Sequence, residues 1–137
     1  AKWVAKASGV VAGLPVAARV FQLLDEEIKF VARAAEGESC LPGQVIAEII
    51  GSLDALLMGE RVALNLAMKL SGIASLTRQY VEKIEDLPTH VVDTRKTTPG
   101  LRVLEKYATQ LGGAINHRMG LDDAAMIKDN HITAAGG

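Results

Sequence analysis

Short apolar runs separated by turn residues fill the N-terminal part of the chain. Two such runs flank Ser8-Gly9, where a small residue and a glycine favour a tight turn. After Gly13, apolar residues recur at helical spacing, which indicates an amphipathic helix. The pattern therefore predicts a hairpin with strands over 2–7 and 10–12, a helix over 14–24, and strands over 28–34 and 44–50.

A helical period replaces these short runs after Ser52. It continues to Gly72, and a second helical run over 74–84 ends before Pro88. Because glycine weakens a helix interior, we predict two consecutive helices with a boundary between two domains near Gly72. The residues that carry the first period are Leu53, Leu57, Leu64 and Met68.

The C-terminal part alternates between strand-like and helical patterns. Apolar runs predict strands over 90–94 and 124–127, and a helical pattern covers 101–111. Thr98 is the expected N-cap of this helix, with Pro99 at its first position. A β-α-β order of this kind is typical of a parallel sheet or barrel.

These elements assign the chain to the α/β class. Residues 1–72 form a first domain of strands and helices, and residues 73–137 form the beginning of a second, β/α domain. No internal repeat and no low-complexity tract interrupts this division.

Composition and charge exclude several kinds of partner. The chain has 137 residues, of which 49% are hydrophobic, and its net charge is −1, so we expect no nucleic acid partner. No apolar run approaches the roughly 20 residues of a membrane span, so we expect no membrane partner. The single cysteine, Cys40, excludes an internal disulfide and fits a reducing, cytoplasmic compartment.

Three groups of cationic side chains follow the predicted elements of the second domain. Arg95-Lys96 comes after the first strand, Lys128 comes after the second, and His117-Arg118 lies in the loop between them. Because residues at the carboxyl ends of parallel strands meet at one edge of the sheet, we expect these side chains to share a pocket. Any one of them alone is more simply explained as a solvated loop charge, although this explanation is weaker for Lys128, which directly follows the apolar run over 124–127. Together they predict a site for a ligand with several negative groups, such as a dicarboxylate or a phosphate.

Other polar residues have simpler explanations. Arg61 shares a helix face with Asn65, which by itself indicates a solvated surface. His131 is interpreted as a helix-cap residue and His90 as structural. The pair Asp122-Asp123 could bind a metal, but such a pair more commonly begins a helix or turn.

Motifs along the whole chain follow the order found in one enzyme family. They are, in chain order, Gly9–Leu14, Pro42-Gly43-Gln44, Gly59–Asn65, Leu70–Ile73, Asp93–Arg102, Gly112-Gly113, Asn116–Leu121 and Ile127–His131. On these motifs the chain resembles quinolinate phosphoribosyltransferase. The resemblance implies transfer of phosphoribosyl from phosphoribosyl pyrophosphate to quinolinate. The products are nicotinate mononucleotide, pyrophosphate and CO₂, and the reaction needs Mg²⁺.

The resemblance also assigns roles to residues of this chain. Arg95, His117, Arg118 and Lys128 would surround the quinolinate carboxylates, and Thr94 and Lys96 would complete this substrate-binding set. Lys96, which also faces the phosphoribosyl donor, and Lys128 would be catalytic. Arg61 would enter the site of a neighbouring subunit, so the protein would be at least a homodimer.

The fold implied is an N-terminal α/β sandwich followed by an incomplete α/β barrel. A whole β/α barrel takes roughly 200 residues or more, so only its first part fits after Ile73. The acidic residues that the family uses near the donor and Mg²⁺ would lie beyond Gly137, and no metal ligand is expected in this segment. We therefore expect the 137 residues alone to bind quinolinate poorly and to be inactive.

Two alternatives remain from the sequence. The protein could be a relative that acts on another pyridine or another acid. It could also be a non-enzymatic carrier module of the biotinyl or lipoyl type, which needs a lysine at a hairpin tip. No lysine lies between Lys29 and Lys69, which argues against the carrier.

Overall fold

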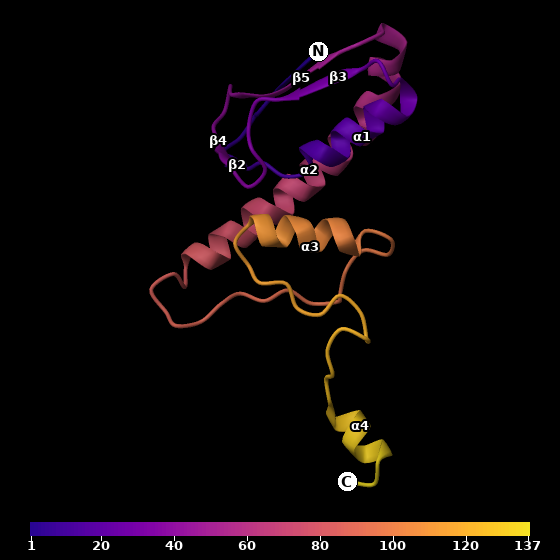
Figure 1. Cartoon of the computed structure of the whole chain (residues 1–137). Helices are drawn as coiled ribbons and strands as arrows, with labels where there is room; N and C mark the ends of the chain where they lie inside the picture. Colours follow the sequence, from indigo (N-terminus) through magenta and orange to yellow (C-terminus); the bar gives the residue numbers. More distant parts are fainter.

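The computed structural model describes all residues, 1–137, and has two parts joined by one long helix (Figure 1). Five short strands and a helix precede this long helix, and two further helices follow it. The elements are β1 (Lys2–Val4), β2 (Gly9–Val10), α1 (Leu14–Leu24), β3 (Lys29–Ala32), β4 (Ser39–Cys40), β5 (Val45–Ile50), α2 (Leu53–Glu82), α3 (Arg102–Leu111) and α4 (Asp129–Ala134). None of the helices is both long and apolar enough to cross a membrane.

The N-terminal part contains a three-stranded antiparallel sheet in the order β1-β5-β3 and a separate pair, β2-β4. The predicted hairpin between residues 2–7 and 10–12 is therefore wrong. Trp3 pairs instead with Ala47 of β5, and both side chains are buried. Burial of the large indole favours this long-range pairing over a local turn.

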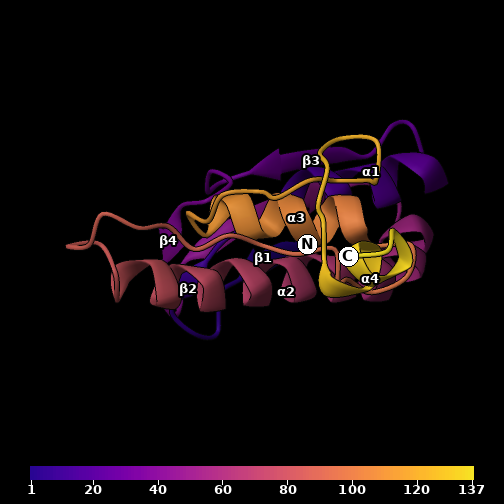
Figure 2. The same ribbon diagram turned by 90° about the horizontal axis from the view of Figure 1, so that it is seen from below.

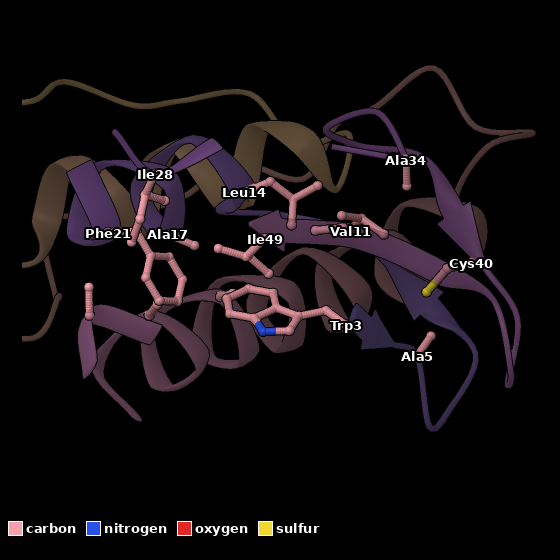
Figure 3. Packing of buried hydrophobic residues seen from close by; sticks show 14 residues of the cluster. Trp3, Ala5, Val11, Leu14, Ala17, Phe21, Ile28, Ala34, Cys40 and Ile49 are labelled. Atoms are coloured by element: carbon pink, nitrogen blue, oxygen red, sulfur yellow. The ribbon is translucent and has the colours of Figure 1, made fainter. Parts of the chain in front are cut away.

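The core of this part lies between the sheet and the two helices α1 and α2 (Figure 3). The rings of Trp3, Phe21 and Phe30 are in mutual contact, with centroids 5.8 to 6.3 Å apart. Small residues of α2 allow α1 to approach closely. At Gly59, an added Cβ atom would lie 2.7 Å from the ring of Phe21. The predicted helix over 14–24 is confirmed at both ends.

Helix α2 runs for 30 residues without interruption, so the prediction of two helices separated at Gly72 is wrong. One glycine costs a helix about 1 kcal/mol, which packing on both sides of it readily offsets. Its first half packs against α1 through Ala63 and Ala67, and its second half packs against α3 through Leu70 and Ala74. Figures 1 and 2 both show α3 lying beside this second half.

Side chains also join the two parts. The Glu36 carboxylate accepts hydrogen bonds from the N–H groups of Gly13 and Leu14 at the start of α1, both at 2.8 Å, and from the Tyr107 hydroxyl of α3 at 2.7 Å. The Arg78 guanidinium of α2 donates to carbonyl oxygens on both sides, those of Gly37, Leu111 and Gly112. The position of α3 is therefore fixed to the N-terminal part.

The second part contains little regular strand. Val92 and Ile115 form an isolated parallel bridge, and the predicted strands over 90–94 and 124–127 do not form. A strand requires a hydrogen-bonded neighbour along its length, and residues 124–127 have none. The end of the chain, including α4, extends away from the body and is exposed (Figure 1).

Helix α3 begins at Arg102, so Thr98 is not its N-cap and Pro99 is not its first residue. Residues 98–101 instead form a turn, in which the carbonyl of Thr98 accepts the N–H of Leu101 at 3.0 Å. Gly100, at a φ of 78°, reverses the chain there and prevents an earlier helix start.

Candidate functional site

A pocket of about 310 Å³ lies where the loop after Val92 meets the loop after Ile115. Its lining is polar and mostly cationic, and six of the seven residues predicted for the site lie in it. The lining residues are Asp93, Thr94, Arg95, Lys96, His117, Arg118, Met126 and Lys128. The seventh, Arg61, does not line it.

The parallel bridge explains why two distant loops meet. The N–H of Asp93 donates to the carbonyl of Ile115 at 3.1 Å, and the N–H of Ile115 donates to the carbonyl of Val91 at 2.9 Å. Both loops therefore leave from the carboxyl ends of two parallel segments, as predicted. The second segment is at Ile115 and not at 124–127, and Lys128 reaches the pocket from the N-cap position of α4.

The loop over 94–97 is held by its own side chains and by α3. The Thr94 hydroxyl accepts the N–H of Lys96 at 3.1 Å. The Arg102 guanidinium donates to the Arg95 carbonyl, to the Thr97 hydroxyl and to the carbonyl of Met119 in the facing loop. Arg102 therefore fixes the two sides of the pocket relative to each other.

Arg95 lines the pocket, and one of its donors is unsatisfied. Its Nε is buried and has no hydrogen-bond partner, the one such side-chain atom in the structure. A buried donor without a partner costs free energy, which a bound anion would recover. Arg118 differs, because its Nη1 donates to the carbonyl of Ala124 at 2.6 Å and so holds the following loop.

The imidazole of His117 is oriented by its neighbour. Its Nδ1 accepts the N–H of Arg118 at 2.7 Å. In the neutral ring this hydrogen bond assigns the proton to Nε2, which leaves an N–H donor for a ligand. At the C-terminal side, Nδ1 of His131 accepts the N–H of Lys128 at 3.0 Å, which confirms the interpretation of His131 as a cap residue.

Three residues that form one hydrogen-bonded cluster at the pocket were not assigned a role from the sequence: Asp93 lines the pocket, and Lys106 and Asn116 lie outside its lining. Asp93 accepts a hydrogen bond from the Lys106 ammonium, and its Oδ1 also accepts the N–H of His117 at 2.7 Å. With its amide nitrogen turned toward these acceptors, Asn116 donates to Asp93 Oδ2 at 2.8 Å and to the Lys106 carbonyl at 2.9 Å. The signal in the sequence was a carboxylate directly after an apolar run, which requires a partner when buried.

The structure contains no group of three or more His, Cys, Asp or Glu side chains arranged to hold a metal ion. Asp123 uses Oδ2 to accept the N–H of Met119 at 2.6 Å, so its role is in a turn. Asp93, the carboxylate in the pocket, is occupied by Lys106 and Asn116. These residues do not form a site for Mg²⁺.

Arg61 is exposed on the first half of α2, which packs against α1 and not against α3. Large apolar side chains surround it on the exposed helix surface. Leu57, Met58 and Val62 are each more than half exposed. The surface that carries Arg61 is thus free in the single chain.

Together, these observations describe an α/β protein with a cationic pocket where two loops leave the carboxyl ends of parallel segments. The chain belongs to the quinolinate phosphoribosyltransferase family. Residues 1–71 match the quinolinate phosphoribosyl transferase N-terminal domain, and residues 73–137 match the C-terminal domain of the same family.

Relatives and solved structures agree with this assignment. The chain is 66% identical to a probable nicotinate-nucleotide pyrophosphorylase [carboxylating] of Synechocystis and 52% identical to one of Bacillus subtilis. These matches cover 99% of this chain and 46% and 47% of those proteins. A crystal structure of NadC from Streptococcus pyogenes superposes with a TM-score of 0.93 at 52% identity, over 98% of this chain and 49% of that one. The chain therefore spans about half the length of the relatives it matches, and the expected α/β fold is confirmed.

Proposed function

We propose that this chain belongs to an enzyme that transfers phosphoribosyl from phosphoribosyl pyrophosphate to quinolinate. The products are nicotinate mononucleotide, pyrophosphate and CO₂, in the de novo synthesis of NAD. The observation that carries this proposal is the single pocket in which Arg95, Lys96, His117, Arg118 and Lys128 meet. The names of the matched relatives, nicotinate-nucleotide pyrophosphorylase and quinolinate phosphoribosyltransferase, support it.

Quinolinate suits this pocket because it carries two carboxylates on one flat ring. Arginine binds a carboxylate through two parallel N–H donors, and the buried, unpartnered Nε of Arg95 is one donor in need of an acceptor. His117 Nε2 and the ammonium of Lys128 supply further donors. Fixing both carboxylates would orient the ring nitrogen toward the anomeric carbon of the donor.

The transfer step separates charge. Positive charge grows on the ribosyl group as the bond to pyrophosphate breaks, while the pyrophosphate oxygens become more negative. Lys96 would stabilise this leaving group from its place in the pocket. Loss of CO₂ then leaves the bonding electron pair on the ring carbon beside the positively charged nitrogen, and a proton from water takes the place of the carboxylate, so no protein nucleophile is needed. Mg²⁺ is part of the proposed reaction, but the residues of this chain form no site that would hold it.

We further propose that the protein is a homodimer and that Arg61 enters the neighbour's pocket. Arg61 is exposed, lies outside its own pocket, and is bordered by exposed apolar side chains of the kind found at interfaces. A cytoplasmic location fits the single buried thiol of Cys40. Some plant relatives are named as mitochondrial or chloroplastic.

Titration calorimetry with quinolinate and nicotinate tests the proposal on protein expressed from its native gene. We expect quinolinate to bind roughly 10- to 100-fold more tightly, because nicotinate lacks one carboxylate and its charged hydrogen bonds. Formation of nicotinate mononucleotide is followed in parallel by chromatography. Lys83→Met, which changes an exposed lysine outside the pocket, is the control. Equal affinities, or preference for another acid, would contradict quinolinate as the substrate. They would favour the alternative, a related enzyme that acts on a different acid.

A further inference from the structure

Lys106 is the one charged residue of the chain that is fully buried, with 1% of its surface exposed. It lies on α3, directly beneath the candidate pocket, and it is not among the pocket-lining residues. Its ammonium forms an ion pair with Asp93, whose side chain is 8% exposed. Burial of two charges costs several kcal/mol of desolvation, so such a pair is weak evidence for a purely stabilising role.

The pair is attached to the loop that carries the cationic side chains. Asp93 Oδ1 accepts both the Lys106 ammonium and the N–H of His117, and Asp93 Oδ2 accepts the amide of Asn116. Asp93 therefore holds the backbone that positions the imidazole of His117 and the guanidinium of Arg118. Asp93 in turn is held in its orientation by Lys106.

The charge of Asp93 makes its partner necessary for ligand binding. Asp93 is the single carboxylate in the lining of a pocket otherwise made for anions. An unpaired carboxylate there would repel a dicarboxylate at short range, and low local polarity would strengthen the repulsion. Lys106, which does not line the pocket, supplies the compensating charge.

We infer that Lys106 is a positioning residue, which neutralises Asp93 and thereby fixes the loop of His117 and Arg118 for binding a dicarboxylate. This inference rests on the proposed function. Lys106 itself does not line the pocket. Its effect passes through Asp93 to the backbone of His117.

The test compares Lys106→Met with the double variant Asp93→Asn/Lys106→Met, on protein expressed from its native gene. Methionine keeps the length of the lysine side chain without its charge. Asparagine keeps the oxygen that accepts the N–H of His117 and removes the charge that Lys106 balances. Lys83→Met is the matched control, because Lys83 is exposed and lies outside the pocket.

We expect Lys106→Met to weaken quinolinate binding at least tenfold in calorimetry. The double variant should recover most of this loss, beyond any effect of Asp93→Asn alone, because the unbalanced charge is gone. Because removal of both charges can also restore stability, affinities are compared only among variants that are folded at the assay temperature. Unchanged affinity in a folded Lys106→Met protein, or a double variant as weak as Lys106→Met, would overturn the inference.

A second readout separates this inference from the proposed function. The amide proton resonance of His117 reports its hydrogen bond to Asp93 whether or not quinolinate binds. We expect this resonance to move in Lys106→Met and to return toward its original position in the double variant. If the unaltered protein does not bind quinolinate, the proposed function fails, and the His117 resonance alone then tests the positioning role of Lys106. A His117 amide resonance that does not move in Lys106→Met would reject that role.

Discussion

At the scale of single residues, Glu36 joins the two parts of the chain. Its carboxylate accepts two N–H groups at the start of α1 and the hydroxyl of Tyr107. Burial and the neighbouring carboxylate raise the pKa of Tyr107 to about 12. The neutral phenol is thus favoured in the folded protein, because it alone can donate to Glu36.

This raised pKa predicts a loss of stability at alkaline pH. In the unfolded chain Tyr107 loses its proton near pH 10, whereas in the folded protein it does so near pH 12. The contribution is therefore complete below pH 10 and is lost as the pH rises from 10 to 12. Tyr107→Phe removes the hydrogen bond, so it should cost about 1 kcal/mol at pH 8 and show a weaker decline above pH 10.

Urea unfolding of both proteins between pH 8 and pH 12 measures this difference. Tyr80→Phe serves as the control, since Tyr80 is 62% exposed and its hydroxyl forms no hydrogen bond within the chain. If the free energy of unfolding fell equally with pH in Tyr107→Phe and in the unaltered protein, the pKa of Tyr107 would not differ between the folded and unfolded states as expected.

Sequence reasoning reached the cationic residues that line the pocket but not the buried ion pair that supports them. Arg95 and Lys96 could be predicted because they follow an apolar run whose end is one of two parallel segments. Lys128 was predicted from a strand over 124–127 that does not form, and it reaches the pocket from the N-cap position of α4. The ion pair of Asp93 with Lys106 could not be predicted. Its partners lie on different elements, and nothing local in a helix pattern reveals that one lysine turns inward.

At the scale of elements, the predicted and observed helices and strands agree where local sequence signals are enough to determine them. Helix α1 was predicted at both ends because Gly13 ends the preceding run and the apolar stripe that follows is continuous. The long helix α2 was divided wrongly because Gly72 is a local signal that tertiary packing overrides. The strands over 90–94 and 124–127 failed because a strand depends on partners elsewhere in the chain.

The turn before α3 is held by an ion pair that links it to α2. Glu105 accepts the N–H of Thr98 at 3.0 Å and pairs with Lys69 of α2 at 3.0 Å. The hydrogen bond from Thr98, followed by the pairing with Lys69, lowers the pKa of Glu105. The Glu105 side chain is only 12% exposed, so this contact is partly shielded from water.

A lowered pKa predicts loss of stability in acid. The contribution of Glu105 is complete above its unfolded pKa, near 4.5, and is lost as the pH falls through its lower folded value. Glu105→Gln should therefore cost about 1 kcal/mol at pH 7 and lose less stability on acidification than the unaltered protein. Thermal unfolding from pH 7 to pH 3 measures this. Identical acid profiles would show that the carboxylate of Glu105 is not the group responsible.

At the scale of the whole molecule, the pocket and Arg61 lie at different halves of α2 within one chain. The pocket is built where α3 and its loops pack against the second half of α2, whereas Arg61 is exposed on the first half. A closed symmetric dimer can bring the first half of one α2 to the pocket of its partner. The structure of a single chain leaves Arg61 without another evident role.

A hybrid dimer tests this arrangement directly. One subunit carries Arg61→Ala and the other carries Arg95→Ala, with different affinity tags, so that purification through both tags isolates hybrids. If Arg61 serves the partner's pocket, one pocket contains both arginines and the other contains neither. The hybrid should then keep about half of the unaltered activity per dimer, although each parent homodimer is nearly inactive. If Arg61 acts in its own subunit, both pockets of the hybrid are defective and nicotinate mononucleotide formation stays at the level of the parents.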